Sequence, residues 1–476
     1  MNASFPTPCY RAGSLSYSRA GLMLLFGWLL WGDVCYTIME AVVPTILPIK
    51  LKQLGASNVI LSVIMTMLPG ILSSVLCPWI SFWSDRYRSR LGRRIPFILF
   101  TAPLLALSLI CLGYCDEIGN AVHSWGFFHL PIDAVRIAVI MVFMVSFTFF
   151  NDFVGSVFWY LFNDVVPEMF LARFMSMFRV VGILAATFYH VYIFRYAETH
   201  MTAIFTGAAL LYLFGFGLMC WKVREGVYAP PPPTGEPGMG IFRGVKIFIR
   251  ECYSIPHYWF LFAMNMFTAI SLATSIFTIF WHQSLGLQMD EIGKINGVMC
   301  AVGAVMILLS GWIADRYHPI RAVLAGRILS LAVVTPFGLI WLFVTPCPSV
   351  VFWIFIAATI VFSPVKALIG IGDPPLLMKV FPRERYGQFC SANALLTCLG
   401  RICGGVAAGA FFDLIRRLGA TGDFVYRFIP VWTWFFEALT LVCLICFYRS
   451  WKKHGGDESY QAPMVSTDLI HGKPVL

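Results

Sequence analysis

The sequence predicts an all-α integral membrane protein with about twelve transmembrane helices in two pseudo-symmetric six-helix bundles. Three observations lead to this prediction: the composition, the length of the uncharged segments and an internal repeat. Of the 476 residues, 59% are hydrophobic and only 12% are charged. Charged residues make up about a quarter of a typical soluble domain. Soluble proteins rarely expose large apolar patches, so this much apolar surface indicates a chain that lies in a bilayer.

Several uncharged segments are long enough to cross a bilayer. Residues 95–115 and 295–314 carry no charge, and each is about as long as the ~20 residues that a membrane-spanning helix needs. Residues 328–365 are also uncharged, and the sequence TPCPS at 345–349 interrupts them. Because two prolines in five residues are typical of a turn, we expect a helical hairpin in the membrane there.

The same reading along the chain predicts twelve spans with two tails and one long linker. The spans are expected at 20–48, 57–80, 95–115, 134–163, 169–195, 201–221, 257–283, 293–314, 322–344, 349–378, 385–413 and 426–448. This divides the chain into a cytoplasmic N-terminal tail, a first bundle, a cytoplasmic linker, a second bundle and a cytoplasmic C-terminal tail, at 1–19, 20–221, 222–256, 257–448 and 449–476.

The linker has a composition of its own. It contains four consecutive prolines at 230–233 and further Gly and Pro up to 240, which predicts an extended segment. After it, Arg243, Lys246 and Arg250 would share one helical face. This pattern fits either a helix on the membrane surface or an extension of the next span.

Basic residues indicate the orientation. Lys and Arg gather in the tails and in the loops that would share their side, and such an excess marks the cytoplasmic side. The first apolar run has no small-residue cleavage site, so we read it as a span and not as a cleaved signal peptide. We therefore expect both termini in the cytoplasm and an inner or plasma membrane location.

The two halves repeat each other. The dipeptide Leu-Gly at 54–55 begins a stretch that ends in Asp-Arg-Tyr at 85–87, and the same landmarks recur at 285–286 and 315–317. Pro167 is followed at plus seven and plus nine by Phe and Ser, and so is Pro382. Duplicated membrane bundles are typical of secondary transporters, so the repeat favours a transport function.

The loop after the second span carries the most specific motif, SDRYRSRLGRRIPFI at 84–98. It resembles the signature that members of the major facilitator superfamily carry between their second and third helices. The second half keeps a shorter copy, GWIADR at 311–316. The resemblance implies the major facilitator fold and a cytoplasmic gating motif. The residues of that motif are Asp85, Arg86, Arg90, Gly92, Arg93, Arg94, Gly311, Asp315 and Arg316.

The motif also has a physical interpretation of its own. An Asp at a helix end beside several Arg can form charge-assisted hydrogen bonds and act as a latch that differs between transport states. The alternative is that the arginines only set the orientation in the membrane. An orientation signal would not require an Asp in both halves, which favours the latch.

Two further segments resemble sugar symporters. The RLGRRIP form of the arginine motif, at 90–96, is similar to that of the glycoside-pentoside-hexuronide cation symporters and of the related sucrose transporters. The segment YTIMEA at 36–41 looks like part of the sucrose-type proton symporters. The segment DVVPEMFLAR at 164–173 looks more like the glycoside-pentoside-hexuronide cation symporters. This resemblance implies a carrier of a sugar or glycoside, coupled to a cation and most plausibly to a proton. We expect the carrier to be a monomer.

A set of ionisable and polar residues falls near the centres of the predicted spans. Holding a charge there costs about 2.5 to 3.5 kcal/mol, so the set favours a solute path over a membrane scaffold. The proposed path residues are Asp33, Tyr36, Glu40, Asn151, Asp152, Arg179, Lys366 and Arg401. Glu40 or Asp33 would carry the proton, and Asp152 and Lys366 would contact the solute or pair across the halves. Alternatively, Asp152–Arg179 and Arg401–Glu437 form static ion pairs.

Other functions are weighed against transport of a sugar. The same fold could carry a lipid, a drug-like compound or an organic anion, or serve as a scaffold without a path. The sequence shows no phosphate-binding glycine loop, no nucleophile elbow and no metal-ligand spacing, so we expect no enzyme, cofactor or metal. The net charge of +10 reflects basic loops, and we expect no nucleic-acid partner.

Overall fold

The computed structural model describes residues 10–126, 130–228, 248–344 and 347–463, without the side chains of a few helical residues among them. The chain divides into two compact units. The first contains Met1–Pro233 and Met289–Ala301, and the second contains Thr234–Gln288 and Val302–Leu476.

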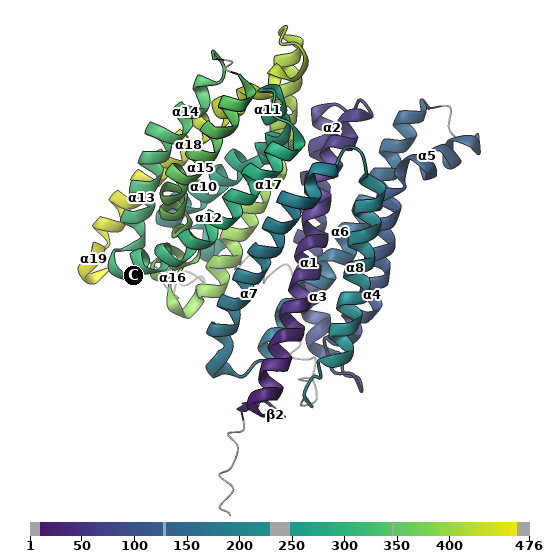
Figure 1. Ribbon diagram of the computed structural model, residues 1–476. Coiled ribbons are helices and arrows are strands. Elements are labelled where there is room, and N and C mark those ends of the chain that lie inside the picture. The colour runs from purple at the N-terminus through teal and green to yellow at the C-terminus, as the bar shows by residue number, and fades with distance from the viewer. Residues whose placement is uncertain (1–9, 127–129, 229–247, 345–346, 464–476) are drawn as a thin grey trace, which may run out of the picture. The chain divides into compact units, whose positions relative to one another are not determined.

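The first unit is a bundle of long helices that run side by side (Figure 1). Its helices are α1 (Arg19–Gln53), α2 (Asn58–Ser62), α3 (Leu68–Arg86), α4 (Ile95–Gly113), α5 (Cys115–Ser124), α6 (Ile132–Val165), α7 (Glu168–Phe188) and α8 (Met201–Lys222). The π-helix η1 (Val63–Met67) joins α2 to α3, and η2 (Tyr189–Ile193) with the 3-10 helix η3 (Phe194–Tyr196) extends α7. Helix α1 packs against α7 and α8, and α6 packs against α3 and α4.

The second unit is also helical. Its elements are α10 (Pro256–Ser271), η4 (Leu272–Phe277), α11 (Thr278–Ser284), α13 (Pro319–Leu329), η5 (Ser330–Val334), α14 (Thr335–Ile340), α15 (Pro348–Gly370), η6 (Gly372–Leu376), α16 (Leu377–Val380), η7 (Arg383–Arg385), α17 (Tyr386–Arg417), η8 (Gly422–Phe428), α18 (Ile429–Lys453) and α19 (Gly456–Ser459). Helix α12 (Met289–Arg316) belongs partly to each unit. Helix α10 packs against α17 and α18, and α13 packs against α15.

The predicted fold class is confirmed. Within the described residues, eleven helices are long and apolar enough to cross a membrane. Each of them overlaps one predicted span, and the remaining span, 293–314, lies within α12. Every backbone N–H inside a bilayer must be satisfied locally, which is why each uncharged segment forms a helix.

The structure adds two elements that the sequence did not indicate. A short hairpin of β1 (Tyr10–Ala12) and β2 (Leu15–Tyr17) precedes α1, and α5 is a ten-residue helix in the loop before α6. Gly13 allows the tight turn of the hairpin because its φ is +56°. The proline run at 230–233, Arg243 and Lys246 lie outside the described residues, and 248–253 are helical.

The sequence repeat has a structural counterpart. Gly55 and Gly286 both adopt positive φ, +73° and +84°, at the end of the first helix of each half. Pro167 is the N-cap of α7, and Pro382 is the N-cap of η7, which leads into α17; their ψ values are 136° and 126°. The two pairs of landmarks therefore mark equivalent backbone positions in the two halves.

Small residues hold α1 tightly against α8. A Cβ on Gly215 would clash with Cys35 Sγ, and a Cβ on Gly32 would clash with Met219 Sδ. Small residues let membrane helices approach closely and gain van der Waals contact. This contact fixes the rotation of α1, and with it the direction of the polar residues on that helix.

Candidate functional site

The polar cluster of the first unit is built around a buried carboxyl group on α1. Asp33 is only 2% exposed, and its Oδ1 accepts a hydrogen bond from Thr37 Oγ1 at 3.4 Å. A Cβ on Gly182 of α7 would lie 3.1 Å from Asp33 Oδ2, so the glycine makes room for that oxygen. Oδ2 has no hydrogen-bond partner in the described part of the chain. A buried carboxyl with an unused oxygen is a group that can hold a proton.

Tyr36, one turn along α1, reaches towards α6. Its hydroxyl lies next to the side chain of Asn151 and close to the carboxyl groups of Glu40, Asp152 and Asp33. Its ring packs between Phe158 and Phe216, with centroid distances of 6.1 Å to each. Tyr36 therefore connects the carboxyl groups of α1 with the polar pair on α6.

The polar pair on α6 is only partly satisfied. Asp152 Oδ2 accepts a hydrogen bond from Ser73 Oγ of α3 at 2.8 Å. Asn151 Oδ1 is buried and has no partner within the described residues. Buried polar atoms are normally hydrogen-bonded, so an open acceptor is suited to a ligand hydroxyl. Of the predicted path residues, Asp33, Tyr36, Glu40, Asn151 and Asp152 thus come together in one cluster.

Gly155 sets the position of Tyr36. A Cβ at this position would lie 2.8 Å from the Tyr36 hydroxyl oxygen. Gly155→Ala should therefore displace the Tyr36 ring, at a cost of about 1–3 kcal/mol for overpacking. We expect a lower midpoint of thermal unfolding and slower solute uptake in reconstituted vesicles. Gly217→Ala is the matched control, because a Cβ there meets nothing within 4 Å. Equal behaviour of the two variants would show that Tyr36 is not held in this way.

The other three predicted path residues are basic side chains on three different helices. Arg179 on α7, Lys366 on α15 and Arg401 on α17 are all exposed. None of them has an ion pair with another described residue, so the alternative Asp152–Arg179 pair is not present there. The alternative Arg401–Glu437 pair is wrong because Glu437 binds a different arginine.

That arginine is Arg327 of α13, which the sequence reading did not single out. Arg327 Nη1 lies 2.9 Å from Glu437 Oε1 of α18, and Nη2 donates to Thr268 Oγ1 of α10 at 2.8 Å. The two charged side chains are only 6% and 11% exposed. This buried network joins three helices of the second unit.

The arginine motif forms a second charged network at the start of α4. Arg93 binds Asp164, at the end of α6, through Nε at 2.9 Å and Nη2 at 2.5 Å. Arg94 reaches the same carboxylate through Nε at 3.1 Å and also donates to Ser84 Oγ. Paired arginine–carboxylate contacts of this kind are among the stronger hydrogen bonds in proteins. They fasten the loop at 87–94 to α6.

Glu225, just after α8, caps the N-terminus of α4. Its carboxylate accepts the backbone N–H groups of Arg93, Arg94 and Ile95 at 2.9, 2.8 and 2.6 Å. The first N–H groups of a helix lack partners within the helix and attract negative charge. Gly92 is required beside the cap, because its φ is +108° and a Cβ there would clash with the Glu225 side chain.

Tyr228 completes this network. Its hydroxyl donates to Glu225 Oε2 at 3.0 Å, and the Arg93 guanidinium lies 4.3 Å from the centre of its ring. Burial, followed by the negative charges of Glu225 and Asp164, raises the pKa of Tyr228 well above its usual range. The phenol therefore stays protonated and remains a donor to the capping carboxylate.

The predicted latch is thus only partly visible. The side chains of Asp85, Arg86 and Asp315 and the surroundings of Gly311 are not among those that the structure describes, so a latch through the two Asp residues stays a prediction. Arg90 and Arg316 are exposed. The carboxylates that bind the described arginines are Asp164 and Glu225, and the sequence reading gave neither a role.

Glu225→Ala should weaken the start of α4. Loss of a helix cap costs about 0.5–2 kcal/mol, and here one side chain satisfies three N–H groups. We expect a lower unfolding midpoint and faster amide exchange at 93–97. Glu117→Ala, which removes an exposed carboxylate in the first turn of α5, is the control. Unchanged exchange at 93–97 in the Glu225 variant would contradict the capping role.

Comparison with known protein families shows which family this chain belongs to. The family model of the Major Facilitator Superfamily matches residues 29–405, which include the polar cluster, the arginine-motif network and most of both units. This chain belongs to the Major Facilitator Superfamily. Superfamily membership agrees with the repeat, the membrane-spanning helices and the arginine motif.

Two curated superfamily relatives match part of the chain. Proton-associated sugar transporter A of Homo sapiens is 36% identical over 135 residues, which are 26% of this chain and 17% of that protein. Sucrose transport protein SUC3 of Arabidopsis thaliana is 29% identical over 97 residues, which are 20% of this chain and 16% of that protein. The chain therefore matches less than a fifth of the length of either relative.

Solved superfamily structures match nearly the whole chain. A bacterial homologue of the human lysosomal transporter Spinster, inward-facing and occupied, has a TM-score of 0.63 at 15% identity, covering 92% of this chain and 99% of that one. The nucleoside transporter NupG has a TM-score of 0.59 at 14% identity, covering 90% and 99%. The xylose transporter XylE from E. coli has a TM-score of 0.56 at 12% identity, covering 94% and 97%. At these identities, the likenesses show the fold.

Proposed function

We propose that this superfamily member moves a sugar or glycoside across a membrane by proton-coupled alternating access. The observation that carries the proposal is the polar cluster of the first unit, where Asp33 is buried with one oxygen unused. Such a group is costly to bury, and a purely structural bundle has little reason to keep it.

In this proposal the carboxyl groups of α1 carry the proton. Asp33 accepts a hydrogen bond from Thr37, whereas Glu40, two turns away, is exposed. A proton could enter at Glu40 and neutralise one of the carboxylates near Tyr36. Neutralisation removes the repulsion between nearby carboxylates, so binding of a proton would change the state of the cluster.

The polar pair on α6 is proposed to bind the solute. Asn151 offers an open carbonyl oxygen, and Tyr36 and Asp152 offer a hydroxyl and a carboxylate. These groups supply hydrogen-bond donors and acceptors but no positive charge that would select an anion. Such a set suits a neutral polyhydroxyl compound. We propose that Lys366 of the second half adds a donor. The names of the two curated relatives, a proton-associated sugar transporter and a sucrose transport protein, support the same solute class.

An organic anion is the second candidate. Arg179, Lys366 and Arg401 are exposed cations without an ion pair to another described residue, and an anionic solute could use them. A lipid, a drug-like compound and a scaffold without a path have no such specific observation in their favour. We propose that both termini lie in the cytoplasm, on the basis of the basic loops. We also propose a monomer in an inner or plasma membrane.

A binding screen tests the solute class. Purified protein is heated with panels of sugars and glycosides, nucleosides, organic acids and lysolipids, and the unfolding midpoint is recorded. A ligand that binds only the folded protein raises its free energy of unfolding, and with it the midpoint. At a ligand concentration of 100 times the Kd, this stabilisation is about 2.7 kcal/mol. We expect a sugar or glycoside to produce the largest shift. A shift with organic acids alone would replace the sugar proposal by the anion alternative.

A further inference from the structure

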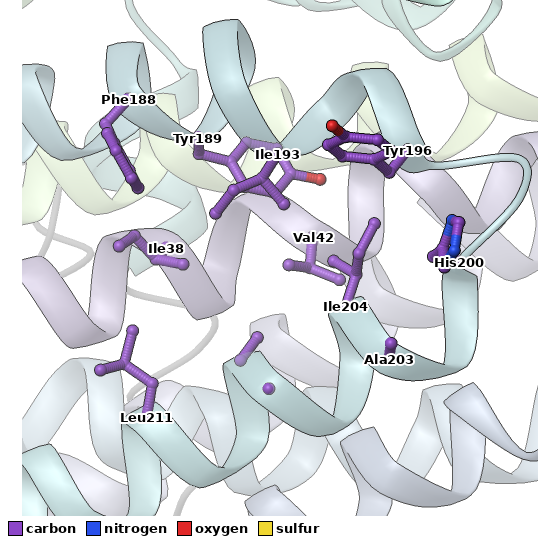
Figure 2. A pocket seen from close by; sticks show the side chains of 12 residues that line it. Ile38, Val42, Phe188, Tyr189, Ile193, Tyr196, His200, Ala203, Ile204 and Leu211 are labelled. Carbon is purple, nitrogen blue, oxygen red and sulfur yellow. The ribbon is translucent and has the colours of Figure 1, made fainter.

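The first unit also contains an apolar pocket of about 550 Å³ that the transport proposal does not use. It lies among α1, the extension of α7 by η2 and η3, and α8 (Figure 2). A volume of this size is within the range of about 300–1,000 Å³ that is usual for sites that bind small molecules. The question is which molecule it could hold.

The pocket is separate from the polar cluster. Ile38 of α1 lines it, and Ile38 is two residues from both Tyr36 and Glu40. Successive residues of an α-helix are turned by about 100°, so Ile38 points about 200° away from both. The pocket and the polar cluster therefore lie on different faces of α1.

The wall on α8 is hollow because its residues are small. Ala203 and Gly207 line the pocket, and a Cβ on Gly207 would meet nothing within 4 Å. On the opposite wall, the Tyr189 hydroxyl forms a hydrogen bond of 2.6 Å with Thr45 Oγ1. Tyr189 thus has its polar atom satisfied, and it contributes an aromatic ring to the lining. The interior offers contact surface for a hydrocarbon chain and little else.

Polar groups occur at one end of the pocket. Tyr196 and His200 lie together there, as Figure 2 shows, at the point where η3 ends and α8 begins. The Arg195 guanidinium lies 4.8 Å from the centre of the Tyr196 ring and is 49% exposed. Its Nη1 lies 3.9 Å from Oδ1 of Asp290, with which it forms a weak ion pair. Aromatic and basic residues at the end of a span are typical of the level of the lipid headgroups.

We propose that this pocket binds a membrane phospholipid, with one acyl chain between α1, α7 and α8 and the phosphate at Arg195. All three walls belong to helices that are long and apolar enough to span a membrane. The surrounding medium therefore supplies acyl chains at high concentration. A guanidinium at the polar end complements a phosphate, and it would give no advantage to a sterol.

Photolabelling tests the proposal on the full-length protein in liposomes. A phosphatidylcholine that carries a diazirine in one acyl chain is activated by light, and the labelled peptides are mapped by mass spectrometry. We expect labels to concentrate at 189–211. Gly207→Leu should reduce them at least about fivefold by filling the pocket, equivalent to about 1 kcal/mol of binding. Gly217→Leu on the same helix is the control, because the space around its Cβ is also open but it does not line the pocket.

Two further arms identify the occupant. Arg195→Gln should reduce labelling by the phospholipid and leave the weak labelling by a diazirine fatty alcohol unchanged. Unlabelled phosphatidylcholine should compete on the parent protein, which keeps the test decisive if Gly207→Leu does not fold. Even labelling along all spans, equal labelling of the two glycine variants, or stronger labelling by a diazirine sterol would overturn the proposal. None of these readouts depends on transport, so their outcome is independent of the proposed function.

Discussion

Glu40→Gln should abolish uphill accumulation of solute and leave solute exchange close to the rate of the parent protein. The amide is nearly isosteric with the carboxyl group but cannot release or bind the proton at working pH. Without the titrating group, the proton no longer changes the affinity for solute, an effect that is typically about 5–150-fold for coupled sites. Exchange moves solute in both directions without net proton movement, so it should continue. Proton-driven uptake and counterflow in vesicles measure the two activities separately.

Two comparisons sharpen this result. Glu117→Gln removes an exposed carboxylate of α5, far along the chain from the cluster, and should accumulate solute like the parent protein. Lys366→Ala should lose both accumulation and exchange, because it would remove a solute contact. If Glu40→Gln and Lys366→Ala both accumulate solute like the parent protein, neither residue lies on the path and the assignment has to be abandoned.

Glu437→Ala should destabilise the second unit by about 3–5 kcal/mol, the usual cost of removing one partner of a buried ion pair. Arg327 would lose the carboxylate that lies 2.9 Å from Nη1, while its side chain remains only 6% exposed. Glu437→Gln should cost less, since the amide oxygen can still accept that hydrogen bond. The midpoint of thermal unfolding, followed in detergent or nanodiscs, measures the order of the variants.

A double variant distinguishes a buried pair from two separate contributions. In Arg327→Met with Glu437→Met both charges are removed and two apolar side chains fill the space. We expect it to be more stable than Glu437→Ala alone, because no uncompensated charge remains. Additive losses in the double variant would show that the two side chains do not act as a pair.

Local patterns predicted the spans well. The uncharged segments became helices because a bilayer leaves the backbone no other partner, and the prolines at 167 and 382 begin elements where the repeat placed them. Asp33, Glu40 and Asp152 were assigned to the path from their depth in the predicted spans, and that role stays a prediction. Depth within a helix can be read from sequence because each residue rises by about 1.5 Å.

The sequence did not reveal the roles of Arg327, Glu225 and Asp164, for two different reasons. Arg327 lies five residues after the start of its predicted span, whereas α13 begins at Pro319, which places Arg327 about two turns inside the helix. Glu225 and Asp164 contact an arginine 131 and 70 residues away, respectively. Such long-range contacts depend on how helices pack, and neither hydrophobic period nor charge spacing encodes them.

Proton movement driven by solute tests the central claim most directly. Purified protein is reconstituted into liposomes without a membrane potential or a pH gradient, and the pH of the weakly buffered external medium is recorded when the sugar from the binding screen is added. The account predicts that the medium becomes more alkaline, because each inward sugar carries a proton with it, and that Glu40→Gln gives no such response. Sugar entry at the parent rate with no change of external pH would contradict proton coupling.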